Sequence, residues 1–449
     1  MSMNTKYLCI LFFLLNSFAC KKFLETKSAQ RLATPDNLND LQLLLDNPIL
    51  QVGLNAINTG TDEYNVLYSN WQSLSDNNKR AYVWDPELNN SNDWSGPYKG
   101  VFYANTVLFN LERIRGGDDI TRNNIRGAAL FTRGFLFYFI AQQFAPQYDE
   151  ATAGTDLGIV LRLNADFNEV SVRSTVKQTY QQIINDLEAA VKLLPEDQLL
   201  KSRPGKAAAL AMLARVYLQT GDFKKAGENA DACLKINNKL IDYNSLALTA
   251  TFPLGLFSKN DEMLFYFKAS TEVPVSGDET RARVDSNLYR SYDPNDLRKK
   301  AFFKDNGNGT FAFKGSYTGE KTLFNGIATD EVYLIRAECN ARMNNAVAAM
   351  EDLNALLQKR WASGKYAVLS NLSPDQVLQV TLQERKKELL CRGIRWSDLK
   401  RLNKDNRFAM TLKRELNGQV YLLPPNDLRY TVLIPTDIIF LTGIPQNPR

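Results

Sequence analysis

The chain of 449 residues contains no histidine. This absence excludes Ser-His-Asp and Cys-His catalysis, histidine general bases and every metal site that needs an imidazole ligand. Among common enzyme mechanisms, a pair of carboxylates stays open, as in glycoside hydrolases. The 49 acidic residues do not by themselves single out such a pair.

Strong charge and a cysteine framework are also absent. The net charge is only +5, from 54 basic and 49 acidic residues, and no long run of Lys or Arg occurs, so no nucleic-acid partner is expected. Of the five cysteines, Cys9 and Cys20 lie near the N-terminus. Cys233, Cys339 and Cys391 lie in helical patterns and are predicted to be small buried hydrophobes. The sequence is compatible with a single disulfide among these cysteines. A disulfide framework, a zinc site and a cofactor are not expected.

The first 19 residues have the pattern of a signal peptide. Lys6 gives a positive start, and Tyr7 to Leu15 form an apolar run that is too short to span a bilayer. Ala19-Cys20 follows and resembles a bacterial lipobox, so we predict that residues 1–19 are removed and that Cys20 is lipidated. A plain secretory signal is the alternative. No later stretch is long and apolar enough for a transmembrane helix, so membrane attachment would be through lipid.

Residues 203–236 have the pattern of two antiparallel helices. Gly221 can take the positive φ that ends a helix, and Asp222 can cap the next one. Small and aromatic residues recur at helical spacing on each side of this turn, a pattern that resembles the tetratricopeptide repeat; an ordinary helical hairpin is the alternative. The same register recurs later in the chain. The matching positions are Ala214, Gly221 and Ala226 in the first copy and Ala337, Asn344 and Ala349 in the second.

Apolar spacing predicts several further helices. They are expected at residues 38–45, 94–115, 122–144, 175–194, 330–344 and 346–361, with another beginning at Ser373-Pro374. Residues 243–322 differ, because Gly, Asn, Asp and Ser increase and short strand-like runs appear at 263–267 and 310–313. We therefore predict a mainly α fold with helical hairpins as scaffold and a loop-rich, short-strand insertion, the part of such a chain that often carries binding residues.

Aromatic residues gather where helical periodicity fails. Between residues 47 and 92 they stand among Asn, Asp and Ser, which suits sugar recognition because a ring can stack on a pyranose while polar groups bond its hydroxyls. The candidate ligand-binding residues are Trp71, Tyr82 and Trp84, with Tyr292 from the insertion. The alternative is that these rings fill the joins between helices.

Short motifs occur in order along nearly the whole chain after residue 19. They are Cys20-Lys-Lys-Phe-Leu-Glu25, Trp94-x3-Tyr98-x6-Asn105, Arg173-Ser-Thr-Val176, Arg203 to Leu218 with Gly221-Asp222, Glu384-Arg385-x2-Glu388-Leu389, Arg395-Trp396-x-Asp398-Leu399-x-Arg401, Ile434-Pro435 and Gln446-Asn447-Pro448. In this order they resemble the SusD/RagB family of nutrient-uptake lipoproteins of Bacteroidetes outer membranes.

The resemblance implies a SusD-like α-helical fold with a loop-built binding face. It implies a lipid-anchored protein at the cell-surface side of the outer membrane. There it would capture an oligosaccharide, or a peptide, and deliver it to a SusC-like TonB-dependent transporter without cleaving it. The implied division is a signal peptide, an N-terminal part at residues 20–240 and a C-terminal part at residues 241–449. A carboxylate-dependent glycoside hydrolase and a protein-binding tetratricopeptide scaffold are the alternatives.

One motif departs from the family pattern. Relatives usually carry Gly-Glu-Gly before the Arg-Trp pair, whereas this chain has Cys391-Arg392-Gly393, so local ion pairing must differ. We expect a partly buried charge network here, with a catalytic carboxylate pair as the alternative. The expected members are Glu384, Glu388, Arg395 and Asp398.

Overall fold

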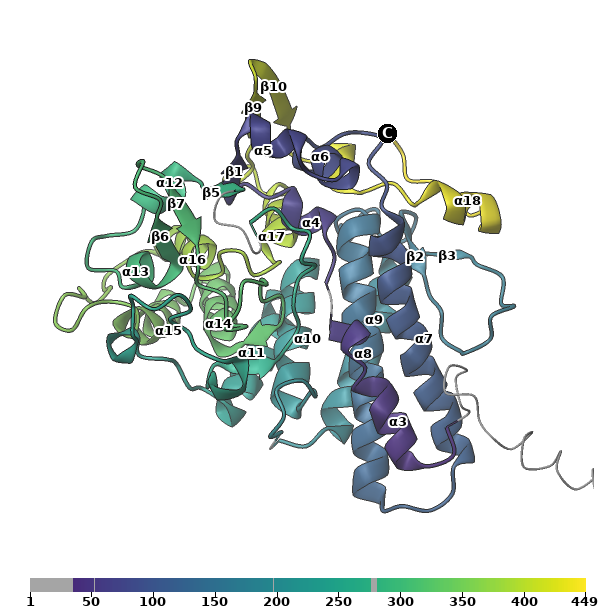
Figure 1. Ribbon diagram of the computed structural model, residues 1–449. Coiled ribbons are helices and arrows are strands. Elements are labelled where there is room, and N and C mark those ends of the chain that lie inside the picture. Colours follow the sequence, from purple (N-terminus) through teal and green to yellow (C-terminus); the bar gives the residue numbers. More distant parts are fainter. Residues whose placement is uncertain (1–34, 52, 197, 276–280) are drawn as a thin grey trace, which may run out of the picture.

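The computed structural model describes residues 35–51, 53–196, 198–275 and 281–449. The predicted signal peptide and Cys20 lie outside these residues. The fold is mainly α, as predicted, with short strands both in the insertion and in other parts of the chain (Figure 1). None of the helices in the described ranges is long and apolar enough to cross a membrane.

Long helices of the N-terminal half form a bundle, seen at the right of Figure 1. Its main members are α3 (Leu38–Leu45), α7 (Ser91–Arg113), α8 (Asp119–Phe144) and α9 (Val176–Leu193). Side chains fix where these helices begin: Thr175 and Gln178 make a reciprocal capping box at α9. The predicted apolar face of α8 is buried, and its Phe135 ring meets Phe265 and Phe267 of the insertion in edge-to-face contacts, with ring centres 5.3 and 4.8 Å apart.

The predicted hairpin is present as α10 (Lys206–Thr220) and α11 (Phe223–Ile236). Gly221 has φ +82°, and the Asp222 side chain accepts a hydrogen bond from the Lys225 amide, so both turn residues act as expected. The second copy is also confirmed, as α14 (Thr329–Arg342) and α15 (Ala346–Gln358), with Asn344 at φ +63° in place of the glycine. Helix α11 packs against α14, so the two hairpins stack.

Small residues allow this close stacking. The four alanines at the matched positions of the two hairpins are fully buried at 0 % exposure. They are Ala214, Ala226, Ala337 and Ala349. The thiols of Cys233, Cys339 and Cys391 are free and buried, as predicted for small hydrophobes.

The loop-rich insertion contains short helices and antiparallel strand pairs. Its elements are β4 (Met263–Phe265), β5 (Ala282–Val284), α12 (Ser286–Arg290), α13 (Arg298–Phe302), β6 (Phe303–Asp305), β7 (Phe311–Phe313) and, just after it, β8 (Ile327–Ala328). Gly307 and Gly309, at φ +77° and +76°, turn β6 into β7. Strand β5 pairs with β1 (Tyr64–Val66), which ties the insertion to the segment before α7.

The segments flanking the bundle and the insertion complete the fold. They are the short helices α4 (Ala56–Thr59), α5 (Tyr68–Gln72) and α6 (Asp76–Tyr82), the pair β2 (Leu157–Val160) and β3 (Arg173–Thr175), helices α16 (Pro374–Glu388) and α17 (Arg395–Leu402), the hairpin β9 (Leu412–Leu416) and β10 (Gln419–Leu423), and α18 (Thr436–Thr442). As predicted, Ser373 caps α16 with Pro374 in its first turn.

Candidate ligand-binding face

Two of the predicted ligand-binding rings lie in the core. Tyr82 is 2 % and Trp84 3 % exposed. The Trp84 indole N–H donates to the Gly60 carbonyl at 2.8 Å. The guanidinium of Arg414 lies 3.4 Å from the Tyr82 ring centre and 5.0 Å from that of Trp84. Neither ring has a face free for a sugar, so the interpretation of Tyr82 and Trp84 as ligand platforms is corrected: they are core residues.

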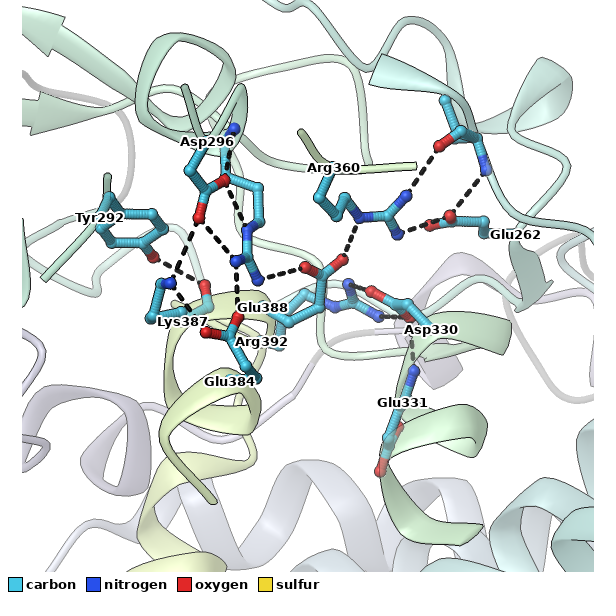
Figure 2. Close-up of polar contacts among 12 residues, drawn as sticks. Glu262, Tyr292, Asp296, Asp330, Glu331, Arg360, Glu384, Lys387, Glu388 and Arg392 are labelled. Carbon is cyan, nitrogen blue, oxygen red and sulfur yellow. Dashed lines mark hydrogen bonds and ion pairs between the residues drawn. The ribbon is translucent and has the colours of Figure 1, made fainter. Parts of the chain in front are cut away.

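Tyr292 is buried too, at 1 % exposure. Figure 2 shows it beside Lys387, and its hydroxyl donates to the Lys387 carbonyl at 2.7 Å. The Arg298 guanidinium and the Lys387 ammonium lie 5.7 and 5.0 Å from its ring centre. The ring therefore stabilises buried cations rather than a ligand, so the interpretation of Tyr292 as a ligand-binding residue is also corrected. Of the four candidates, only Trp71 remains.

Trp71 lies at the surface, half-buried on α5. Its ring stacks on Tyr68, with centres 5.9 Å apart and planes inclined by 20°. Tyr68 is 38 % exposed. The Trp71 indole N–H donates to the Lys79 carbonyl at 3.2 Å, which fixes the ring. We call Tyr68 and Trp71 the aromatic platform; the sequence signal for Tyr68 was its spacing of three residues from Trp71 on one helix face.

The platform adjoins the insertion. The Asn70 side-chain amide donates to the Arg281 carbonyl at 3.3 Å, and Tyr64 to Val66 pair with Ala282 to Val284. Asn65, exposed between these contacts, lies 3.4 Å from a carboxylate oxygen of Asp285. The two regions that the sequence singled out, before α7 and within the insertion, thus meet at one face, seen at the upper left of Figure 1 as α5, β1, β5 and α12.

A hollow of about 240 Å³ lies in the same insertion; we call it the insertion cleft. Its lining combines half-buried rings, threonine hydroxyls and charged side chains. They include Phe252, Lys304, Phe313, Lys314, Glu320 and Lys321. Strand β7, which carries Phe313, packs against β5, so the cleft and the platform are built on connected strands.

A second hollow, of about 270 Å³, lies between α7, the loop 160–171 and α18. Phe102 and Phe167 meet at its rim with ring centres 4.5 Å apart, and Phe167 is 78 % exposed. Its polar groups are used internally, since Asn105 donates to the carbonyls of Arg162 and Asn164, both at 2.9 Å. This hollow is more apolar than the insertion cleft.

The carboxylates of the C-terminal motif are buried and paired. Glu388 accepts from Arg298 at 2.9 Å and from Arg360 at 2.7 Å, while Asp398 accepts from Arg385 and Arg401, each at 2.9 Å. Arg395 pairs instead with Asp62 at 2.7 Å. The predicted network of Glu384, Glu388, Arg395 and Asp398 is corrected: these residues are ion-paired, but mainly with partners outside that set.

The departure at residue 392 has a clear consequence. Arg392 is 3 % exposed and bonds Asp330 at 3.0 Å (Figure 2). Its guanidinium also lies 4.2 Å from the Tyr317 ring centre. The basic Arg392 therefore forms an ion pair with Asp330 of α14, which confirms that the local ion pairing differs from the family pattern. None of the pairs in this motif leaves two carboxylates open to a bound sugar.

Two family descriptions match the chain. One, starch-binding associating with outer membrane, matches residues 22–218, and the other, SusD family, matches residues 327–428. SusD-like protein P2 of Formosa agariphila is 26% identical over 378 residues, which cover 70% of this chain and 72% of that protein.

Solved structures share the fold. A SusD superfamily protein from Bacteroides thetaiotaomicron superposes with a TM-score of 0.74 at 23% identity, over 92% of this chain and 100% of the other. Surface glycan-binding protein A from Bacteroides uniformis gives a TM-score of 0.72 at 16% identity, over 91% and 98% of the two chains. At such identities the likeness concerns the fold alone.

Proposed function

Because the chain belongs to the SusD family, we propose that it captures an oligosaccharide at the aromatic platform and the insertion cleft and delivers it to a transporter without cleaving it. The observation that carries the proposal is the stacked Tyr68–Trp71 pair, which is partly exposed, held by a backbone hydrogen bond and flanked by amides. This is the arrangement that lets rings stack on a pyranose while polar groups bond its hydroxyls. The name of the B. uniformis protein, a surface glycan-binding protein, agrees with this chemistry.

The buried, ion-paired state of the acids in the C-terminal motif is consistent with binding a glycan without cleaving it. A glycoside hydrolase needs two carboxyl groups flanking the scissile bond, one of them able to donate a proton. Here Glu388 is 1 % and Asp398 6 % exposed, and each is held by two guanidinium groups. Burial tends to raise the pKa of Asp398, but the charges of Arg385 and Arg401 outweigh it, so the pKa is lowered. The side chains of both acids are occupied by ion pairs and lie away from a bound sugar. Turnover of a glycan by the purified protein would favour the hydrolase alternative instead.

Removing a platform ring is expected to weaken glycan capture. An aromatic pair is worth about 0.5–1.5 kcal/mol beyond its buried area, so Trp71→Ala or Tyr68→Ala should cost about threefold to tenfold in affinity. Because both rings are partly exposed, the melting temperature should change little. Titration calorimetry with oligosaccharides, alongside thermal melts, measures both quantities.

Two other exposed rings serve as controls for this experiment. Phe109, 55 % exposed on α7, lies outside both hollows, so Phe109→Ala should leave affinity unchanged. Phe167 lies at the rim of the second hollow. Affinity that is lost with Phe167→Ala and kept with Trp71→Ala would place the ligand there and contradict the platform.

The anchor and the partner form the remaining part of the proposal. We propose that Cys20 is lipidated at the outer membrane and that the protein covers a SusC-like TonB-dependent transporter. Two observations support this part of the proposal: the lipobox-like Ala19-Cys20, and the family description, which names association with the outer membrane. A tagged full chain should fractionate with membranes and co-purify a β-barrel transporter in detergent, whereas Cys20→Ala should appear in the soluble fraction. Unchanged fractionation of the variant would refute the anchor.

A further inference from the structure

The strands β1 and β5 form a short ladder beside the aromatic platform, and one side of this ladder is exposed. The four residues that the two strands bury are at most 6 % exposed, namely Tyr64, Val66, Ala282 and Val284. Asn65 lies between the two buried residues of β1, and it is exposed. Because successive side chains of a strand point to opposite sides, the buried residues fix the backbone that carries Asn65.

Asp285 extends the exposed side of the ladder. Asn65 lies opposite Arg283 in the register, and Asp285 follows Arg283 by two residues, so its side chain points to the same side as Asn65. The Asn65 side-chain amide donates to Oδ2 of Asp285 at 3.4 Å, which is longer than the usual range of about 2.7–3.2 Å. We call Asn65 and Asp285 the polar pair.

The carboxylate of this pair is held in place by the helix that follows it. Oδ1 of Asp285 accepts from the backbone amides of Asn287 and Leu288 at 3.0 and 2.9 Å, which caps α12. Among the described residues, Oδ2 of Asp285 accepts only from Asn65, and Oδ1 of Asn65 accepts no hydrogen bond. One carboxylate oxygen thus fixes the orientation, while the other oxygen and the Asn65 amide keep bonding capacity for a ligand.

The polar pair lies close to the platform rings. Asn70, the α5 residue just before Trp71, donates from its side chain to the Arg281 carbonyl at 3.3 Å. Two residues further along the chain, about 7 Å for an extended backbone, lies the residue that stands opposite Asn65. Figure 1 shows α5, β1, β5 and α12 together at this face. A short oligosaccharide that stacks on the platform can therefore reach the polar pair.

An amide beside a carboxylate suits two neighbouring hydroxyls of a sugar. The carboxylate accepts hydrogen bonds, the amide both donates and accepts them, and each hydroxyl can do either. Hydrogen bonds to a charged acceptor are about twice as strong as those between neutral groups. Because the hydroxyls of epimers point in different directions, a fixed pair of groups bonds one epimer fully and leaves groups unpaired with the other.

We propose that Asn65 and Asp285 determine which glycan the protein selects, by binding two neighbouring hydroxyls of a sugar next to the one stacked on the platform. This inference rests on the proposed function and adds the residues that set its specificity. The platform binds the face of a pyranose whatever its hydroxyl pattern, and the polar pair distinguishes sugars by the direction of their hydroxyls.

Epimeric oligosaccharides test the proposal. Titration calorimetry compares cellohexaose with β-1,4-mannohexaose, and isomaltohexaose with α-1,6-mannohexaose. Within each couple the two sugars differ only in the direction of the hydroxyl at C2, which neighbours the free hydroxyl at C3. In at least one couple the affinities of the wild type should differ on the order of tenfold, because one epimer leaves a charged acceptor without its partner.

Variants then assign the selectivity to the polar pair. Asp285→Asn removes the charge and keeps a side-chain oxygen that can cap α12, and Asn65→Ala removes the amide. The double variant should bind the preferred epimer on the order of tenfold more weakly and should bind both epimers nearly alike, since the platform is unchanged. The matched controls make the same changes elsewhere, as Asp118→Asn at the N-cap of α8 and Asn185→Ala at an exposed position of α9, and should keep both affinity and selectivity.

The ratio of the two affinities is the deciding measurement, because partial unfolding would lower both affinities by the same factor. Equal binding within both couples by the wild type, or selectivity that the double variant keeps, would overturn the inference. Binding that depends on Trp71 but shows no dependence on the polar pair would leave the proposed function standing. Absence of binding to all four oligosaccharides would count against both.

Discussion

Arg298→Met is expected to destabilise the protein by about 3–5 kcal/mol, the usual result of removing one partner of a buried ion pair. Arg298 is 0 % exposed and bonds three carboxylates. The shortest distances are 2.7 Å to Asp296, 2.5 Å to Glu384 and 2.9 Å to Glu388. Methionine matches much of the side-chain volume, so the loss would come from uncompensated charge rather than from a cavity.

The network extends beyond Arg298. Glu388 also accepts from Arg360 at 2.7 Å, and Arg360 in turn bonds Glu262 at 2.7 Å (Figure 2). These residues come from the insertion, the end of the second hairpin and α16, so the charges join the insertion to the helical scaffold. Losing Arg298 should therefore loosen the insertion that carries the cleft as well as lower the global stability.

Denaturant unfolding of both proteins measures the change. The control is Arg407→Met, because Arg407 is 54 % exposed in its side chain while it bonds Asp405 and Asp375 at 2.8 and 2.9 Å. Exposed pairs contribute about 0–1 kcal/mol, so this variant should unfold almost like the wild type. Equal effects of the two substitutions would show that the buried network contributes no more than a surface pair.

The pH dependence gives an independent check. Burial tends to raise the pKa of Asp296, but the charge and hydrogen bonds of Arg298 and Lys387 outweigh it, and the pKa is lowered. A carboxyl whose folded pKa lies below its unfolded value contributes stability above the unfolded pKa and loses it as pH falls toward the folded one. Acidification below about pH 4 should therefore destabilise the wild type more steeply than Arg298→Met.

Local signals in the sequence were enough to predict the long helices, whereas the short helices α4, α5 and α6 were missed. Gly221, the capping box of Thr175 with Gln178, and Ser373-Pro374 each act within one turn of the chain, so the side chain and the backbone group it satisfies are close in sequence. The hairpin β9–β10 was missed although it carries a strong signal of the same kind. Asn417 and Gly418, at φ +49° and +78°, form the two-residue turn that Asn-Gly typically makes.

The candidate site could be predicted only in part, because burial of a ring depends on distant residues. Tyr82 is covered by Arg414 and Tyr292 by Lys387, partners that lie far along the chain. A composition rich in Asn, Asp and Ser suggests exposure, but here guanidinium and ammonium groups enter the core and need aromatic faces there. Trp71 has no such cation partner in the described residues, and it is the ring that stays at the surface.

The division at residue 240 stays a prediction. The hairpins on its two sides are in contact, since α11 packs against α14. Arg215 of α10 also bonds Glu331 of α14 at 2.6 Å, and both are buried. The predicted boundary at residue 240 thus separates two hairpins that belong to one scaffold. Stacked hairpins bury their surfaces against each other, and not each within its own half of the chain.

Trp84→Ala is expected to cost about 3–5 kcal/mol of stability, as for other buried Trp→Ala changes, while the protein that remains folded keeps its affinity for glycans. The indole is 3 % exposed, donates to Gly60 and lies beside the Arg414 guanidinium, so its removal leaves a cavity, an unpaired carbonyl and a poorly covered cation. Trp71→Ala should do the opposite, lowering affinity with little change in stability.

Comparing these two variants decides whether each tryptophan is a ligand-binding ring or a core ring, the two roles that the sequence left open. Thermal melts measure the stability of each variant, and calorimetric titrations at a temperature where each is folded measure its affinity. Trp84→Phe is the matched control: it keeps a ring over Arg414 but loses the indole donor, so a smaller loss of about 1–2 kcal/mol is expected. If Trp84→Ala melted like the wild type and lost its ligand, Trp84 would be a binding ring after all, and the segment before α7 would have to expose it when the glycan binds.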